Sequence, residues 1–278
     1  MTEADDYVAS YLREADRERY LSTLFLPVAK RPAVQALLAF ASDIASIQAR
    51  VREPAAGEIR LQWWVDALEG GGHGDVRQNP LAAALLDALS ASRIPTGALV
   101  RLLRARRFDL FHDPMPDVAS FEGYAGESES VLFQLSAMLL IGGEELPGDA
   151  AGHFGVARAL VGHLRAFGYN ASRGRIFLPL SIFSANGASE DMILGGKAGP
   201  QLLAALAQIA DLAQEHLTKG EAALAQLPRA TRGAFVVAAL LRPQLALLRR
   251  HSDPFAVPPD LTDLRKLFAM GWWQLRKG

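Results

Sequence analysis

The chain has 278 residues with 29 basic and 30 acidic side chains, so its formal net charge is −1. This balance argues against a dedicated nucleic-acid binder, and the absence of cysteine excludes disulfides and thiolate metal sites. A hydrophobic content of 50% excludes a disordered chain, and the 47 Ala and 42 Leu residues, which are strong helix formers, predict an all-α protein.

Prolines and glycines divide the chain into segments of helical length. The first segment with a clear apolar face covers 32–45, and the second, 57–68, contains the tandem Trp63 and Trp64. These two side chains point about 100° apart on a helix, so both can be buried only in a thick core. Further helices are expected at 81–92, 97–110, 118–141, 150–167, 200–226, 229–250 and 260–277.

Two places depart from simple helices. Glycine and asparagine are dense over 168–198, where Arg175–Pro179 is short and extended in character. Pro243 is expected to kink the 229–250 helix. No internal repeat or low-complexity linker interrupts the pattern, so a single domain over 1–278 is predicted.

The two ends of the chain bear on its location. The acidic start is unlike a secretory or mitochondrial targeting segment, and the apolar run 131–142 is shorter than the roughly 20 residues of a membrane span. We therefore expect a cytoplasmic protein, and the excess of Arg (24) over Lys (5) suggests a bacterial genome. Near the end, Trp272 and Trp273 stand between basic residues, so the last helix either docks both into the core or rests on a membrane surface.

Several charged groups have an ordinary interpretation. The arginines of 101–107 are spread around their helix, and the carboxylate pairs Asp109/Asp113 and Asp211/Glu215 have i, i+4 spacing typical of solvated helix faces. Asp113 precedes a proline and is expected beyond the helix end. The six histidines contain no i, i+4 pair, so no metal site is predicted.

Four short blocks, in this order and spacing, carry a resemblance to a known family. They are Tyr20–Pro27, Ala36–Phe40, Tyr124–Gly126 and Arg173–Pro179. Over most of its length the chain resembles the squalene/phytoene synthase family. This resemblance implies an all-α, single-domain isoprenoid-synthase-type helical bundle around a central cavity. It also implies head-to-head joining of two prenyl diphosphates, with Mg²⁺ held by aspartates on two facing helices.

The two aspartate-rich motifs of that family are where this sequence differs. The first should follow Phe40, yet 41–50 contains one carboxylate, Asp43. The second falls on 166–170, where Ala166 and Asn170 replace its first and last aspartates. We therefore predict a non-catalytic member with no metal and no cofactor. The alternative is an active prenyl diphosphate transferase in which Asp43, Asp109 and Asn170 hold Mg²⁺ differently.

A closer resemblance favours the prediction of a non-catalytic member. The blocks 164–166, 172–173 and 177–179, with Tyr169, are similar to the branch of the family that includes the mitochondrial complex I assembly factor. This similarity implies assistance in respiratory complex I assembly at the membrane, with a complex subunit or assembly intermediate as protein partner. Peripheral contact with the inner membrane through the C-terminal helix is a separate expectation, which rests on Trp272 and Trp273 and their basic neighbours. An isoprenoid-like ligand in the cavity is the other implied partner.

The resemblance also nominates residues that line the cavity. Among them, Arg165, Arg173 and Arg175 are expected at a polar cavity mouth. The complete set of candidates is Tyr20, Ser22, Asp43, Asp109, Tyr124, Arg165, Tyr169, Asn170, Arg173 and Arg175.

Overall fold

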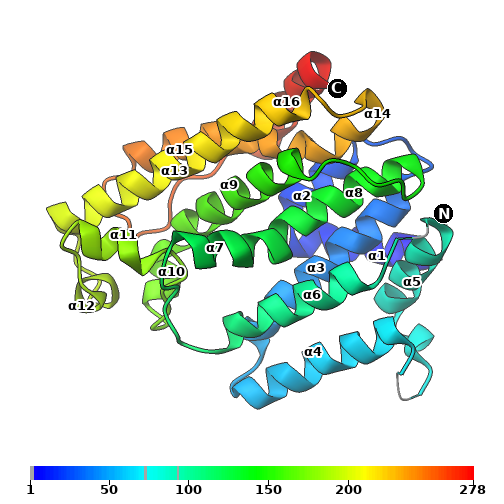
Figure 1. Cartoon of the computed structure of the whole chain (residues 1–278), viewed down its shortest axis with the longest axis horizontal. Coiled ribbons are helices and arrows are strands. Elements are labelled where there is room, and N and C mark those ends of the chain that lie inside the picture. The colour runs from blue at the N-terminus through cyan, green and yellow to red at the C-terminus, as the bar shows by residue number, and fades with distance from the viewer. Residues whose placement is uncertain (1–2, 72–73, 93) are drawn as a thin grey trace.

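The computed structural model describes residues 3–71, 74–92 and 94–278, and within these ranges it contains helices and no strand (Figure 1). The α-helices are α1 (Glu3–Ala15), α2 (Arg17–Thr23), α3 (Arg31–Arg50), α4 (Pro54–Glu69), α5 (Pro80–Ser92), α6 (Gly97–Arg106), α7 (Val118–Ala125), α8 (Val131–Ile141), α9 (Asp149–Arg165), α10 (Phe167–Ala171), α11 (Leu180–Ala185), α12 (Glu190–Leu194), α13 (Pro200–Leu224), α14 (Arg229–Arg232), α15 (Leu241–Arg250) and α16 (Asp263–Lys277). Short 3₁₀ segments are η1 (Val76–Gln78), η2 (Arg107–Leu110) and η4 (Gly233–Leu240), and η3 (Gly126–Ser130) is a π-helical turn. The predicted all-α class is confirmed.

Two hydrophobic clusters build the interior. One joins α9, α13, η4 and α15, and the other joins α1, α3, α5 and α6. Helix α8 contributes to both, with Phe133 in the first cluster and Leu132 in the second. Its sequence is apolar on nearly every side, as expected for a helix enclosed by others. In Figure 1, α9 and α8 lie in the middle of the bundle, between α13 and α6.

The predicted 118–141 helix is interrupted by η3, where the chain widens into a π turn. At this place α9 approaches very closely, because a Cβ on Gly155 would overlap the backbone of Ser130. Ser130 also donates a hydrogen bond from its hydroxyl to the Gly152 carbonyl at 3.0 Å. The π turn and Gly155 together bring the polar residues of η3 against α9, which positions the site described below.

The predicted 229–250 helix is also interrupted in the structure. It consists of α14, the 3₁₀ segment η4 and α15, so the irregularity lies before Pro243 and extends over eight residues. Proline has no N–H to bond the carbonyl four residues earlier, which accounts for a change of helix type on its N-terminal side. By length and composition the segment 229–250 could cross a membrane, but half of its most apolar stretch is buried inside the protein, as in a core helix.

The tryptophan predictions have mixed outcomes. Trp64 is buried and packs edge-on against the Phe40 ring, with 4.9 Å between the ring centroids, whereas Trp63 is only partly buried. In α16, Trp273 packs against the hydrophobic cluster of α9, α13, η4 and α15, and Trp272 is 64% exposed. The prediction that both tryptophans dock into the core is therefore confirmed for Trp273 and wrong for Trp272, and the membrane-surface interpretation stays a prediction. The Arg175–Pro179 stretch is non-helical, as predicted.

Candidate functional site

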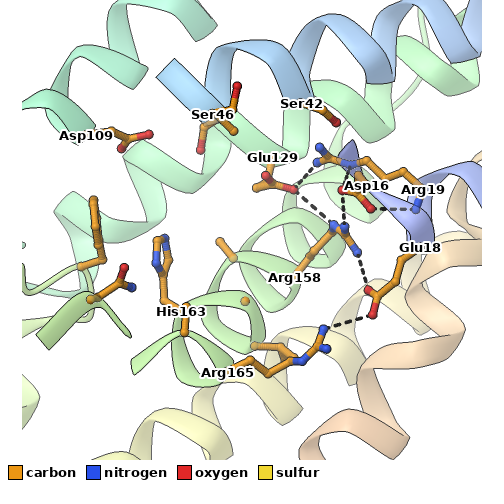
Figure 2. A pocket seen from close by; sticks show the side chains of 18 of the residues that line it. Asp16, Glu18, Arg19, Ser42, Ser46, Asp109, Glu129, Arg158, His163 and Arg165 are labelled. Carbon is orange, nitrogen blue, oxygen red and sulfur yellow. Dashed lines mark hydrogen bonds and ion pairs between the residues drawn. The ribbon is translucent and has the colours of Figure 1, made fainter. Parts of the chain in front are cut away.

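A cavity of about 450 Å³ lies between the two hydrophobic clusters and is bordered by α2, α3, η3 and α9 (Figure 2). Its polar lining residues are Asp16, Glu18, Arg19, Ser42, Ser46, Gln48, Arg106, Asp109, Tyr124, Ser128, Glu129, Arg158, His163, Arg165, Tyr169, Asn170 and Gln244. The charged members come from helices far apart in the sequence. Their mutual contacts determine what the cavity can bind.

Glu129, from the π turn, is the hub of the charged lining. It accepts hydrogen bonds from Arg19 at 2.7 Å and Arg106 at 3.1 Å, and it lies 3.4 Å from the Arg158 guanidinium. Burial alone would raise the pKa of Glu129, but the three guanidinium groups outweigh it and hold the pKa below its usual value. Glu129 is therefore an ionised carboxylate that is paired with three arginines.

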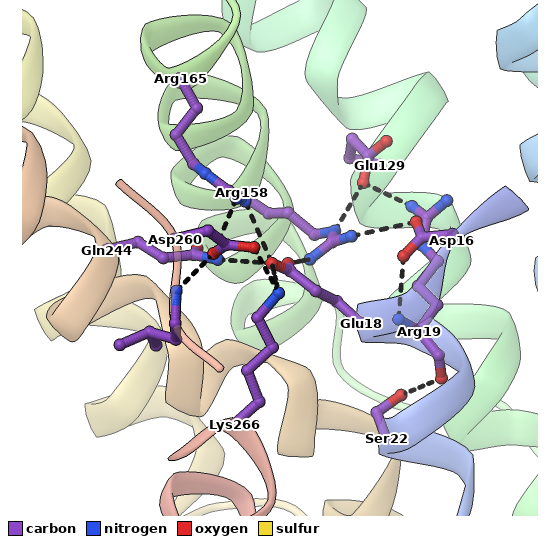
Figure 3. Close-up of polar contacts among 11 residues, drawn as sticks. Asp16, Glu18, Arg19, Ser22, Glu129, Arg158, Arg165, Gln244, Asp260 and Lys266 are labelled. Carbon is purple, nitrogen blue, oxygen red and sulfur yellow. Dashed lines mark hydrogen bonds and ion pairs between the residues drawn. The ribbon is translucent and has the colours of Figure 1, made fainter. Parts of the chain in front are cut away.

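A second cluster surrounds Glu18 and shares Arg158 with the first, since the Arg158 guanidinium lies 3.7 Å from the Glu18 carboxylate (Figure 3). Glu18 accepts from Arg165 at 3.1 Å and from Gln244 at 2.8 Å, and it pairs with Lys266 at 3.2 Å. Burial would raise its pKa, yet the cations lower it. Asp260, in the segment that leads into α16, pairs with both Arg165 and Lys266, at 3.0 and 2.6 Å.

Asp109 and Tyr124 form a third polar group. The Tyr124 hydroxyl donates to Asp109 at 2.7 Å, and Arg106 donates to the tyrosine oxygen at 2.8 Å and to Asp109 at 3.1 Å. Burial raises the pKa of Tyr124 well above its usual value, so the phenol stays protonated. Beside this group, burial lowers the pKa of His163 to about 4, so its imidazole is neutral near pH 7.

Helix α3 supplies the opposite wall and is free of charge there. Its cavity-lining residues are Ser42, Ala45, Ser46 and Gln48. The hydroxyls of Ser42 and Ser46 donate to carbonyls of their own helix, those of Leu38 and Asp43. Across the cavity, Ala166 and Asn170 stand at the α9–α10 junction, at the positions assigned to the second motif.

Half of the predicted site residues line this cavity: Asp109, Tyr124, Arg165, Tyr169 and Asn170. They reach it from η2, α7, α9 and α10, which the fold brings together although 61 positions separate the first from the last.

The other half lie elsewhere. Asp43 is on a different face of α3, where it accepts hydrogen bonds from Arg50, Tyr11 and Trp64, so it does not line the cavity. The i, i+4 geometry of a helix accounts for this, because the residues facing inward are 42, 45 and 46.

Tyr20 packs at the edge of both hydrophobic clusters, and Ser22 bonds the Arg19 carbonyl in a separate narrow pocket. Of the three arginines expected at the mouth, Arg165 alone lines the cavity. Arg173 is exposed and lies over the Tyr169 ring, with 4.5 Å to its centroid, and Arg175 donates to the Asp109 carbonyl.

The charged hub itself was not predicted. The sequence pattern places Arg106 on a solvated face, whereas the structure sets it against Asp109, Tyr124 and Glu129. The available signal was a charged residue inside an otherwise apolar helix, as at Arg158 between Ala157 and Ala159. The surface interpretation is confirmed for Asp211 and Glu215, which pair with Arg249 and Lys219. It is wrong for Asp109, which is buried against Tyr124 and Arg106, whereas Asp113 lies beyond the end of η2.

Comparison with known proteins gives the family. The squalene/phytoene synthase profile matches residues 12–268. The human "NADH dehydrogenase (ubiquinone) complex I, assembly factor 6" is 31% identical over 77% of this chain and 64% of its own length, so the chain spans under two thirds of that relative. The rat protein of the same name is 28% identical over 88% of this chain and 73% of its own length.

Solved structures give the same fold. A dehydrosqualene synthase crystallised with a ligand superposes with a TM-score of 0.84 at 22% identity, covering 99% of this chain and 96% of that one. Squalene synthase HpnC from Alicyclobacillus acidocaldarius superposes with a TM-score of 0.75 at 18% identity, covering 89% of this chain and 93% of that one. With a profile match over nearly its whole length and this shared architecture, the chain belongs to the squalene/phytoene synthase family.

Proposed function

We propose that this chain is a non-catalytic member of its family that assists the assembly of respiratory complex I. Sequence similarity supports the assembly role, since relatives from mammals, Dictyostelium discoideum and Drosophila melanogaster carry that name. The proposed partner is accordingly a complex I subunit or an assembly intermediate.

The proposal that the chain is non-catalytic rests on one observation, the pairing of the cavity carboxylates with arginines. Mg²⁺ takes oxygen ligands in near-octahedral geometry and is usually held by one or two carboxylates together with substrate phosphates. Here Asp16, Glu18, Asp109 and Glu129 are each engaged by at least one arginine. The α3 wall offers no carboxylate at all. The described residues contain no group of three or more His, Asp or Glu placed to hold a metal.

These residues do not fit the magnesium clamps that the family implies. Binding a metal at Glu129 would require displacing its arginine partners and leaving them buried without a counter-charge, which is costly. Two prenyl diphosphates would still bring several negative charges into the cavity. Each missing metal contact would weaken stabilisation of the departing diphosphate by several kcal/mol. We therefore derive no catalytic step through magnesium.

The assembly role is tested by removing the gene from its own host. Membranes of the deletion strain are expected to contain less assembled complex I on native gels and to oxidise NADH more slowly. The wild-type chain supplied in trans is expected to restore both. Normal complex I in the deletion strain would contradict the proposal.

A separate assay tests the non-catalytic part. Purified protein with Mg²⁺ and farnesyl or geranylgeranyl diphosphate is expected to form no squalene, phytoene or presqualene product. Turnover at an ordinary enzymatic rate that Asp109→Ala abolishes would establish the alternative, an active prenyl diphosphate transferase. A cavity that binds an isoprenoid-like ligand without turning it over is compatible with the proposal, as is a cytoplasmic location with peripheral contact at the inner membrane.

A further inference from the structure

Helix α16 exposes a continuous apolar face. Four of its large side chains recur every three or four residues and are 64–83% exposed: Leu264, Phe268, Trp272 and Leu275. The opposite side of the helix buries Met270 and packs on η4 and α2. Phe25, from the α2–α3 connection, lies beside Gly271 and lines the same shallow hollow. Singly exposed apolar residues are ordinary, whereas a contiguous group like this one marks an interaction surface.

Positive charge borders this face. Arg265 and Arg276 are exposed and lie on the Trp272 side of the helix, and Lys277 follows at its end. Among the described residues, none of these three cations has a carboxylate within ion-pair distance, whereas Lys266, on the buried side, is paired with Glu18. The Arg276 guanidinium lies over the Trp272 ring, 5.6 Å from its centroid.

We propose that this face of α16 binds the surface of a membrane that contains anionic lipids. The four apolar side chains would enter the boundary between headgroups and acyl chains, as in amphipathic helices that lie flat on a bilayer. Tryptophan favours this depth because its ring is apolar and its N–H is polar. The unpaired cations at the edge complement lipid phosphates, and this charge complementarity favours a lipid surface over an uncharged apolar partner.

The rest of the fold limits the mode of contact. Trp273 and Met270 pack α16 against the hydrophobic cluster of α9, α13, η4 and α15, so the helix is a docked part of the protein and not a detachable anchor. Contact is therefore peripheral and reversible. The inference does not depend on the assembly role, because lipid binding by this face would hold whatever the cavity does.

Sedimentation of the full chain with vesicles tests the proposal. We expect binding to phosphatidylcholine vesicles that contain phosphatidylglycerol, weak binding to pure phosphatidylcholine, and weaker binding at high salt. The double variant Phe268→Ser/Trp272→Ser is expected to lower partitioning by about tenfold or more. Arg265→Glu/Arg276→Glu is expected to lower it by about fivefold or more for each charge reversed, on the mixed vesicles only.

Matched controls lie on the far side of the bundle. Ile59→Ser removes an equally exposed apolar residue from α4, and Arg104→Glu reverses an exposed charge on α6. Both are expected to leave partitioning unchanged, and unchanged thermal melts would show that all variants fold. Equal binding to the two kinds of vesicle, or equal binding by wild type and the α16 variants, would overturn the proposal. A stable dimer in solution that Trp272→Ser dissociates would assign the face to a second copy and would also overturn it.

Discussion

The two walls of the cavity are built on opposite principles. On the α3 wall, the hydroxyls of Ser42 and Ser46 donate to carbonyls of their own helix, and no charged side chain of α3 lines the cavity. On the facing wall, from α2, η3 and α9, every carboxylate is held by guanidinium groups, with Glu129 shared among three arginines. A buried charge is tolerated only while its partners remain, so the charged wall is a mutually dependent unit and the neutral wall is not.

This contrast predicts the largest effect at the hub. Glu129→Ala leaves three arginines around a missing counter-charge, and we expect a loss of about 3–5 kcal/mol in the free energy of unfolding, measured by urea denaturation. The cavity left by the truncated side chain adds to the loss. Glu129→Gln keeps the size and is expected to lose less. A change below about 1 kcal/mol in Glu129→Ala would show that the arginines are satisfied without it.

The second prediction concerns His163, which lines the cavity and whose titration should make the stability of the fold depend on pH. Its pKa is lowered from 6.5 to about 4 in the folded state, so acid protonates the unfolded chain first. Stability is therefore full above the unfolded pKa and falls as the pH drops below 6.5. Between about pH 7.5 and pH 5 this histidine alone should account for a loss of about 2 kcal/mol. Urea denaturation at several pH values measures the loss.

The control for this prediction is His163→Gln, which keeps a polar side chain but cannot titrate. Its stability should fall less steeply over the same pH range, the difference being the share of His163. Identical profiles for the two proteins would mean that His163 is protonated in the folded state as readily as in the unfolded one.

The smallest effect is expected on the neutral wall. Ser46→Ala removes one hydrogen bond to the Asp43 carbonyl of the same helix, and alanine favours the helix. The free energy of unfolding should change by about 0.5 kcal/mol or less. A loss comparable to that of Glu129→Ala would contradict the distinction between the two walls.

The sequence was sufficient for the helical class, for most helix positions and for the family. It placed Asn170 and Tyr169 at the cavity because the Arg173–Pro179 block fixes their spacing. It could not identify the Glu129 cluster, because its three arginine partners lie 110 and 23 residues before it and 29 residues after it and meet only in the fold. Nor could it place Asp43, whose direction depends on which face of α3 meets the core.

The π turn and η4 show the same limit. Both replace regular helix where packing or a proline demands it. The close approach of Gly155 to Ser130 is the tertiary cause at η3, and a single segment cannot reveal it.

Equilibrium dialysis with farnesyl thiodiphosphate, a non-reacting analogue, tests the central claim, that the cavity carboxylates are committed to arginines and cannot hold Mg²⁺. The affinity of the chain for the analogue is measured with and without Mg²⁺. With no free carboxylates to bridge, Mg²⁺ should leave the dissociation constant unchanged within about twofold. A Mg²⁺-dependent tightening of about tenfold or more, lost in Asp109→Ala, would show that the cavity still assembles a metal site and would contradict the account.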